Sequence, residues 1–241
     1  MDNTLHIGIL YPLHSAEDDY PRLAAALVPP VGVHIVHTDS PNSHQIDASR
    51  VTGSREYLLS GAESLRAENI AVCMWACTSG SFAFGLAGAQ RQAQELADEL
   101  SVPASSTSLA FLSAVRALGL KRVAVAATYP EDLSNAFRSF LAEDNIEVVH
   151  LGCMGIWTGG EVGQLGREEV LHFARANDHP DAEAVLIPDT ALHTVDFLPD
   201  IEAHVGKTVL TANQVTMWEA LRLADRLTPQ SHLGRLMMVT E

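Results

Sequence analysis

Short apolar runs alternate with longer amphipathic segments along the chain. The apolar runs are candidate strands, at residues 5–11, 32–38, 70–76, 102–105, 122–127, 147–151, 184–188 and 208–210. The candidate helices cover residues 16–27, 53–68, 86–100, 108–118, 130–144, 167–177 and 214–226. This alternation is typical of parallel sheets whose faces are covered by helices. The sequence therefore predicts the α/β class.

The two halves of the chain resemble each other. One apolar run at residues 7–12 (IGILYP) and another at residues 123–130 (VAVAATYP) both end in Tyr-Pro. Two further pairs match in the same order, residues 70–78 with 184–190 and residues 114–118 with 220–224. Any two βα units share short apolar runs, but three matched pairs in one order favour an internal duplication.

The duplication predicts two pseudo-symmetric lobes, each a mainly parallel sheet flanked by helices. We place the first lobe at residues 1–119 and the second at residues 120–241, because Gly119 is typical of a helix end. The last helical segment, residues 214–226, either stays with the second lobe or packs back on the first. Ligands of open parallel sheets bind beyond the carboxyl ends of the strands, so we expect the active site between the lobes.

Reactive side chains follow the third apolar run. Residues 77–80 read Cys-Thr-Ser-Gly, and a helix is expected to begin there with its unpaired N–H groups. A thiol at a helix N-terminus has its thiolate favoured, so Cys77 is a candidate nucleophile or base; the alternative is a small core residue. The hydroxyl and N–H groups of Thr78 and Ser79 either bind a carboxylate or an oxyanion, or cap the helix.

Asp189 follows the matching apolar run in the second half. Burial raises the pKa of a carboxyl group and suits it to acid–base chemistry; the alternative role is a helix N-cap. His193 either pairs with Asp189 or lies on a solvated face. Tyr129 either donates a hydrogen bond to the bound anion or anchors the sheet end, and its counterpart Tyr11, with Pro12, is expected to shape the pocket wall.

Composition limits the classes of partner. The chain has 241 residues, a formal net charge of −15 and a pI near 5.0, which argues against nucleic acid and anionic membrane surfaces. No apolar run is long enough to span a bilayer. Three cysteines and the lack of an apolar N-terminal leader favour the cytoplasm; Cys73 and Cys153 are expected in the core. The eleven histidines show no metal-ligand spacing, so no metal is expected.

Several short segments, specific in their order and spacing, resemble one known family. They are residues 7–9, 76–82, 122–129, 154–156, 186–189, 199–202 and 218–222. In them the chain resembles the arylmalonate decarboxylase and maleate cis-trans isomerase group of the aspartate/glutamate racemase superfamily. One branch of about this length is associated with ectoine utilisation. The resemblance implies a site between two lobes that uses no cofactor and no metal, and it makes a homo-oligomer plausible.

The resemblance also implies roles for individual residues. Isomerases of this group use a cysteine from each lobe, whereas the decarboxylases keep only the second-lobe cysteine as proton donor. Cys77 corresponds to the first-lobe cysteine, and Asp189 replaces the second. The groups implied to hold a substrate carboxylate are the hydroxyls of Thr78, Ser79 and Tyr129 and the amides near Thr190 and Ala191.

We therefore expect an enzyme, a cofactor-independent isomerase of a small carboxylate or dicarboxylate. Cys77 is its nucleophile or base, and Asp189 is its acid or base. The alternatives within the group are an arylmalonate decarboxylase-like enzyme and an amino-acid-type racemase. A thiol hydrolase and a non-catalytic carboxylate-binding protein are the alternatives outside it. In each case the expected partner is a small molecule, with no nucleic acid and no membrane.

Overall fold

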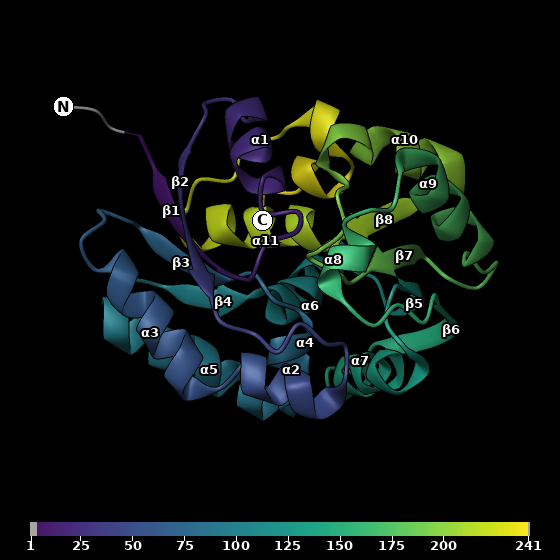
Figure 1. The fold of residues 1–241 in the computed structure, drawn as a ribbon. Coiled ribbons are helices and arrows are strands. Elements are labelled where there is room, and N and C mark those ends of the chain that lie inside the picture. The colour runs from purple at the N-terminus through teal and green to yellow at the C-terminus, as the bar shows by residue number, and fades with distance from the viewer. Residues whose placement is uncertain (1–3, 241) are drawn as a thin grey trace.

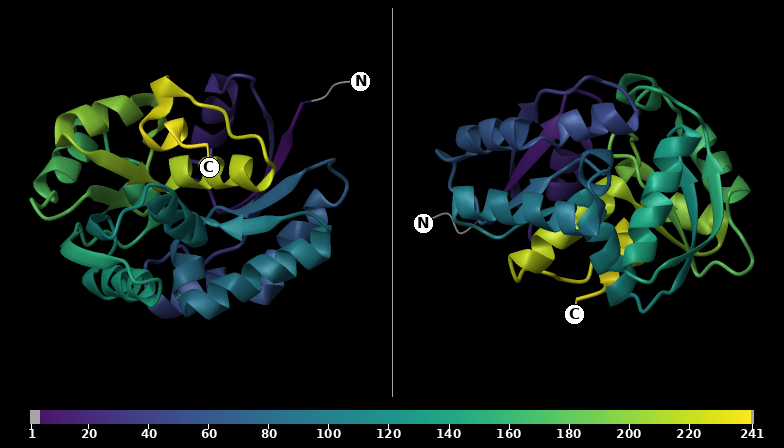
Figure 2. Two further views of the ribbon diagram at one scale, coloured as in Figure 1. Left: turned by 180° about the vertical axis from the view of Figure 1, so that it is seen from behind. Right: turned by 90° about the horizontal axis from the view of Figure 1, so that it is seen from below.

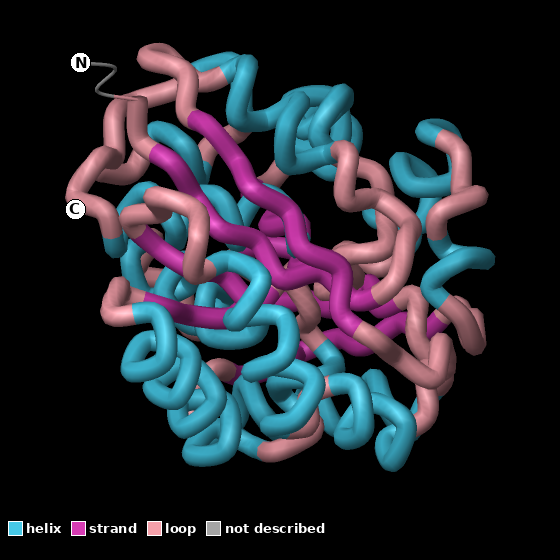
Figure 3. The backbone as a smooth tube through the Cα atoms, turned by 60° about the vertical axis from the view of Figure 1, so that its left-hand side comes forward, coloured by secondary structure: helices cyan, strands magenta, loops and turns pink. Residues whose placement is uncertain are grey.

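Two four-stranded sheets lie at the centre of the molecule, and helices surround them (Figures 1 and 3). The computed structural model describes residues 4–240. The first sheet contains β1 (His6–Pro12), β2 (Gly32–Thr38), β3 (Val72–Trp75) and β4 (Ala104–Ser106). The second contains β5 (Arg122–Ala127), β6 (Glu147–Cys153), β7 (Ala184–Ile187) and β8 (Thr208–Thr211). All eight predicted strands are confirmed.

The two sheets have the same topology. Their strand orders are β2-β1-β3-β4 and β6-β5-β7-β8, and every neighbouring pair is parallel. Each strand of the second sheet thus occupies the place of the strand four earlier in the first. This shared order confirms the α/β fold with two pseudo-symmetric, mainly parallel sheets.

Eleven α-helices cover the sheets within the described residues. They are α1 (Asp19–Ala26), α2 (Ile46–Thr52), α3 (Arg55–Leu65), α4 (Ser79–Phe82), α5 (Gly85–Leu100), α6 (Thr107–Ala117), α7 (Glu131–Glu143), α8 (Gly159–Val162), α9 (Arg167–Ala176), α10 (Leu198–Val205) and α11 (Ala212–Leu223). The helix expected to begin at residues 77–80 is present as α4, whereas α2, α8 and α10 were not predicted. None of the three missed helices exceeds eight residues, which is too short for a helical period to stand out.

Strand side chains alternate between separate hydrophobic clusters, as the two-residue period of a strand requires. In β1, Ile7 and Ile9 point into the largest cluster, whereas Leu10 points into a smaller one beneath α3 and α5. The largest cluster also includes Val123 and Val125 of β5, so one apolar core is continuous between the lobes. This shared core fixes the two sheets relative to each other.

The last long helix, α11, lies between the two sheets (Figures 1 and 2). It packs against α1, α6, β3 and β4 of the first lobe as well as against β8. The Thr107 and Thr216 hydroxyls lie 2.7 Å apart, and the Tyr20 hydroxyl donates to Asn213 Oδ1 at 2.9 Å. The division of the chain at residues 119 and 120 stays a prediction.

None of the helices within residues 4–240 combines the length and the apolar character that crossing a membrane requires.

Candidate active site

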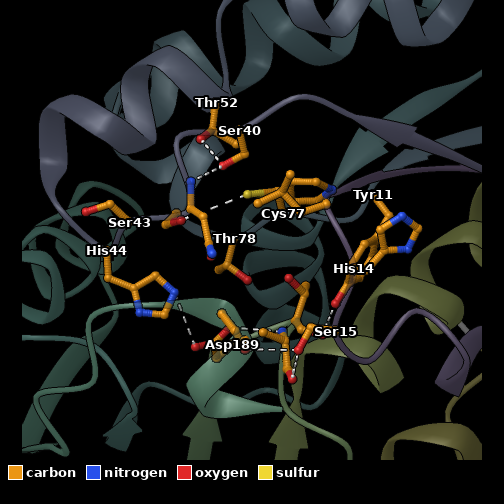
Figure 4. Close-up of a pocket in the computed structure, with 18 of the residues that line it drawn as sticks. Tyr11, His14, Ser15, Ser40, Ser43, His44, Thr52, Cys77, Thr78 and Asp189 are labelled. Atoms are coloured by element: carbon orange, nitrogen blue, oxygen red, sulfur yellow. Dashed lines mark hydrogen bonds and ion pairs between the residues drawn. The ribbon is translucent and has the colours of Figure 1, made fainter.

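Cys77 and Asp189 line one pocket between the lobes (Figure 4). Each follows the third strand of its sheet by two residues, Cys77 after β3 and Asp189 after β7. Because the strands are parallel, their carboxyl ends meet at one edge of each sheet, and these two edges face each other. The pocket encloses about 60 Å³, well below the roughly 300–1,000 Å³ typical of drug-sized sites. Its size suits a small molecule.

The Cys77 thiol is buried, with 5% of the residue exposed. Its Sγ accepts a hydrogen bond from the Gly80 N–H at 3.3 Å, and Ser79 Oγ lies 3.9 Å away. Burial raises the pKa of Cys77 to about 11, and the facing Asp189 contributes to the rise, while the bonds from Gly80 and Ser79 oppose it. The predicted effect of nearby N–H groups is therefore present, but desolvation outweighs it, and the unliganded thiol keeps its proton at neutral pH.

Thr78 places an unpaired hydroxyl on the pocket wall. It is the N-cap residue of α4, yet its side chain makes no capping hydrogen bond. Thr78 Oγ1 is buried and makes no hydrogen bond within 3.5 Å among the described residues, and it interacts weakly with the nearby Tyr129 hydroxyl. A buried polar group without a partner costs free energy unless a ligand or water satisfies it. Helix capping therefore does not explain Thr78, and its hydroxyl is free to bind a ligand.

Both oxygens of the Asp189 carboxylate accept hydrogen bonds from its own lobe. The Ala191 N–H donates to Oδ1 at 2.9 Å, and the Thr128 hydroxyl donates to Oδ2. His44 Nε2 lies 3.9 Å from the same Oδ2. Asp189 is only 4% exposed, so the side chain is held in one orientation towards the pocket. The alternative of a helix N-cap does not apply, because a turn rather than an α-helix follows it.

His44 is a pocket residue that the sequence analysis missed. It lies in the loop between β2 and α2, and its ring packs edge-on against Tyr129 with centroids 5.0 Å apart. Its backbone N–H donates to the Trp157 carbonyl and its Nδ1 lies 2.9 Å from the Ile156 carbonyl oxygen. A carbonyl oxygen only accepts, so Nδ1 carries the proton and Nε2 faces Asp189. No local motif marks His44, because its partners belong to the other lobe.

The two predicted tyrosines are buried and bonded to the Asp189 loop. The Tyr129 hydroxyl donates to the Pro188 carbonyl at 2.7 Å, and the Tyr11 hydroxyl donates to the Thr190 carbonyl at 3.0 Å. Burial, with Asp189 and Cys77 nearby, raises the pKa of Tyr129 well above its ordinary value. Both hydroxyls thus remain protonated and position the loop. All the remaining predicted binding residues line the pocket: Pro12, Ser79, Thr190 and Ala191.

Other predicted candidates lie elsewhere. His193 Nε2 contacts Asp18 Oδ1 at 2.9 Å and therefore does not pair with Asp189. Cys73 is buried in the core as expected, whereas Cys153 is exposed because it ends the edge strand β6, so its expected burial was wrong.

A second cluster of titratable groups lies at the pocket mouth. Glu17 Oε1 is 2.8 Å from His14 Nδ1 and 3.3 Å from His37 Nε2. The Ser15 N–H and the two imidazoles outweigh partial burial and lower the pKa of Glu17 to about 2. His14 and Glu17 are three residues apart in one loop, whereas His37 belongs to β2, so the sequence spacing marks only part of the cluster. Hydrogen bonding accounts for this arrangement, in which Glu17 fixes both rings.

Comparison with known proteins identifies related sequences. The family model of arylmalonate decarboxylase matches residues 44–237. The arylmalonate decarboxylase of Bordetella bronchiseptica is 30% identical over 174 residues, which cover 70% of this chain and 71% of that protein. The chain belongs to the arylmalonate decarboxylase family. It is also 24% identical to the maleate isomerase of Geobacillus stearothermophilus, over 56% of this chain and 54% of the relative.

Solved structures show the same architecture. A liganded double mutant of arylmalonate decarboxylase, in which one glycine is replaced by cysteine and one cysteine by serine, superposes with a TM-score of 0.86 at 25% identity, covering 97% and 98% of the two chains. The maleate isomerase of Pseudomonas putida gives a TM-score of 0.91 at 19% identity, covering 99% and 100%. At that identity the second match shows the shared fold. The arylmalonate decarboxylase family thus includes this chain, whose pocket sets a thiol opposite a carboxylate.

Proposed function

We propose that this protein is a cofactor-independent isomerase of a small carboxylate, with Cys77 and Asp189 acting from opposite walls of the pocket. The observation that supports it is their placement at matching strand ends around a cavity that holds only a small molecule. Thr78 Oγ1, buried and unpaired among the described residues, is the group we assign to the substrate carboxylate. Membership of a family that contains a decarboxylase and an isomerase agrees with this class of chemistry.

The protonation of Cys77 sets the order of events. Since its pKa is raised to about 11, Sγ must lose a proton as it attacks. Asp189 takes that proton while Sγ bonds to one carbon of a conjugated double bond, and then passes it to the neighbouring carbon. The substrate now has a single carbon–carbon bond and rotates about it. The reverse steps return the proton, break the C–S bond and restore the double bond, so no net proton or electron is consumed.

A solved relative agrees with covalent addition of this kind. The Nocardia farcinica maleate cis-trans isomerase, as a cysteine-to-serine mutant, carries a covalently bound succinylcysteine intermediate. Its chain is 19% identical to this one, with a TM-score of 0.89 and coverage of 98% and 99%. In the present chain the one thiol in the pocket lining is Cys77, and we assign the covalent role to it.

Decarboxylation is the second candidate. The 30% identity to an arylmalonate decarboxylase favours it, and a thiol that stays protonated at neutral pH is a suitable proton donor to an enediolate. In this reaction the carbon–carboxylate bond breaks to release carbon dioxide, and the Cys77 proton moves to the resulting carbanion. The two reactions differ in whether a carboxylate is lost.

One experiment separates these reactions. Purified protein is incubated with small unsaturated and α-substituted carboxylates in deuterated water and followed by NMR. Isomerisation changes the alkene signals, racemisation replaces a carbon-bound proton by deuterium, and decarboxylation releases carbon dioxide. We expect isomerisation or exchange without carbon dioxide. Binding of carboxylates with none of these changes would contradict the proposal and support a non-catalytic carboxylate-binding protein.

A further inference from the structure

The pocket offers no unpaired cation. Within the described residues its lining contains neither lysine nor arginine, and its histidines are His14 and His44. His14 Nδ1 lies 2.8 Å from Glu17 Oε1, and His44 Nε2 lies 3.9 Å from Asp189 Oδ2. Each of these rings, if protonated, would have its positive charge beside a carboxylate of the protein, Glu17 for His14 and Asp189 for His44. A substrate with two carboxylates would therefore bring a second negative charge to a wall that already carries the Asp189 carboxylate.

Three donors beside Asp189 already have partners. The Ala191 N–H and the Thr128 hydroxyl donate to Asp189, and the Tyr129 hydroxyl donates to the Pro188 carbonyl. Next to these paired donors the wall presents the Asp189 carboxylate, an acceptor, to the cavity. The Asp189 side chain accepts the Ala191 N–H, so this N–H is not available to an anionic group of the substrate.

His44 and the Asp189 carboxylate face each other at the pocket. Nδ1 of His44 donates to the Ile156 carbonyl, so Nε2 is the ring atom turned towards Asp189 Oδ2, and these two atoms are 3.9 Å apart. That distance is too long for a direct hydrogen bond. A substrate ammonium group beside Asp189 would donate an N–H to Oδ2, and a hydroxyl group there would donate its one hydrogen to the same oxygen. An ammonium group would also neutralise the Asp189 charge.

The first-lobe wall has the opposite character. Thr78 Oγ1 is buried and has no partner within residues 4–240, and the hydroxyls of Ser43 and Ser79 also line this wall. Hydroxyl groups of this kind donate to a carboxylate. Taken with the proposed isomerase function, on which this step rests, we infer that the substrate is a monocarboxylate that also carries a hydrogen-bond donor, an ammonium or hydroxyl group. Its carboxylate binds at Thr78, and its donor lies beside Asp189.

The test measures binding and turnover separately. Propanoates that differ only in the group on carbon 3 are compared, namely succinate (a carboxylate), 3-hydroxypropanoate (a hydroxyl) and 3-aminopropanoate (an ammonium), with maleate and (Z)-4-aminobut-2-enoate as an unsaturated four-carbon pair. Affinity is read by calorimetry on the Cys77→Ala variant, and turnover by NMR on the wild type. We expect the donor-bearing monocarboxylates to bind on the order of tenfold to a hundredfold more tightly than the dicarboxylates. Asp189→Asn should remove most of that preference.

A matched control isolates the local charge. Asp47→Asn removes the same charge from an exposed side chain outside the pocket and should leave the preference unchanged. Equal or tighter binding of succinate or maleate by the protein overturns the inference, as does failure of every donor-bearing compound to bind. A strong preference without turnover of any compound would contradict the isomerase proposal and leave the inference intact.

Discussion

Cys77 and Asp189 occupy matching places in the two lobes, yet the backbone after them differs. After β3 the chain enters the short helix α4, and the Gly80 N–H donates to the Cys77 sulfur. After β7 it makes a turn, and the Ala191 N–H donates to the Asp189 carboxylate. In both lobes the strand-end side chain accepts a hydrogen bond from the following backbone. The duplicated fold thus keeps the position of the reactive group and leaves its chemistry free to differ.

The two walls of the pocket differ in whether their groups donate or accept a proton. The first-lobe wall has a protonated thiol and an unpaired Thr78 hydroxyl, both able to donate. The second-lobe wall has a carboxylate that accepts. A pair of identical groups would make the walls interchangeable, whereas a thiol facing a carboxylate gives the proposed reaction one nucleophile and one proton acceptor.

Removing the first-lobe thiol is expected to have the largest effect. Cys77→Ala should lower turnover about 10⁴-fold or more, because Cys77 is the one thiol among the described residues that line the pocket and thiol addition is the proposed step. The NMR assay in deuterated water measures this loss. Cys153→Ser, at an exposed cysteine, is the matched control and should keep full activity. An active Cys77→Ala variant would falsify the proposed role of the thiol.

Removal of the Asp189 charge is expected to have the second largest effect on turnover. Asp189→Asn keeps an oxygen to accept the Ala191 N–H but cannot take a proton, so turnover should fall about 10²–10³-fold. Steady-state rates with the substrate found in the screen measure it, with Asp47→Asn as the control. Wild-type rates in Asp189→Asn would show that the two lobes do not divide the chemistry as proposed.

Substitution of His44 tests whether its contact with Asp189, across the two lobes, contributes to turnover. His44→Asn keeps a side-chain N–H for the Ile156 carbonyl and removes the nitrogen that faces Asp189. We expect turnover to fall about tenfold, less than for a group that transfers the proton itself. His232→Asn is a matched control, since that ring also bonds a backbone carbonyl, of Ala26, outside the pocket. Equal rates in His44→Asn and wild type would contradict a role for this contact.

The thiol titration measures how strongly the two walls interact. Since the Asp189 charge contributes to raising the pKa of Cys77 to about 11, Asp189→Asn should move the thiolate midpoint to lower pH. At pH 9 the variant then has more thiolate and reacts several-fold faster with iodoacetamide. Thiolate absorbance, recorded in a Cys153→Ser background, gives the midpoint. A midpoint that stays or rises would show that the two groups do not interact.

The smallest effects compare the matching tyrosines. Tyr11→Phe loses the bond to the Thr190 carbonyl and leaves the Ala16 N–H without its acceptor, whereas Tyr129→Phe loses the bond to the Pro188 carbonyl and leaves no backbone N–H without an acceptor. The free energy of unfolding should fall by about 2 kcal/mol in Tyr11→Phe and about 1 kcal/mol in Tyr129→Phe. Urea unfolding measures both, with the half-buried Tyr57→Phe on α3 as control. A larger loss of unfolding free energy in Tyr129→Phe than in Tyr11→Phe would contradict this ranking of the two hydroxyls.

Local patterns were enough to predict most of the fold. All eight strands were found because a buried parallel strand is a short apolar run, and the repeat order followed from comparing such runs. The helices α2, α8 and α10 were missed because each is too short to show a period, whereas α4 begins where the strand-end residues 77–80 predicted a helix start. The predicted helix before Gly119 and the strand from Arg122 are both present, as α6 and β5.

The sequence by itself determined where the reactive groups stand. Cys77 and Asp189 follow apolar strands, and the strand-end position depends only on neighbouring residues. The tertiary structure decided what surrounds them: His44 beside Asp189, the Ala191 N–H already bonded, Thr78 Oγ1 left unpaired and the Cys77 pKa raised. Burial and long-range contacts arise when segments distant in the chain pack together, and no local pattern records which segments will meet.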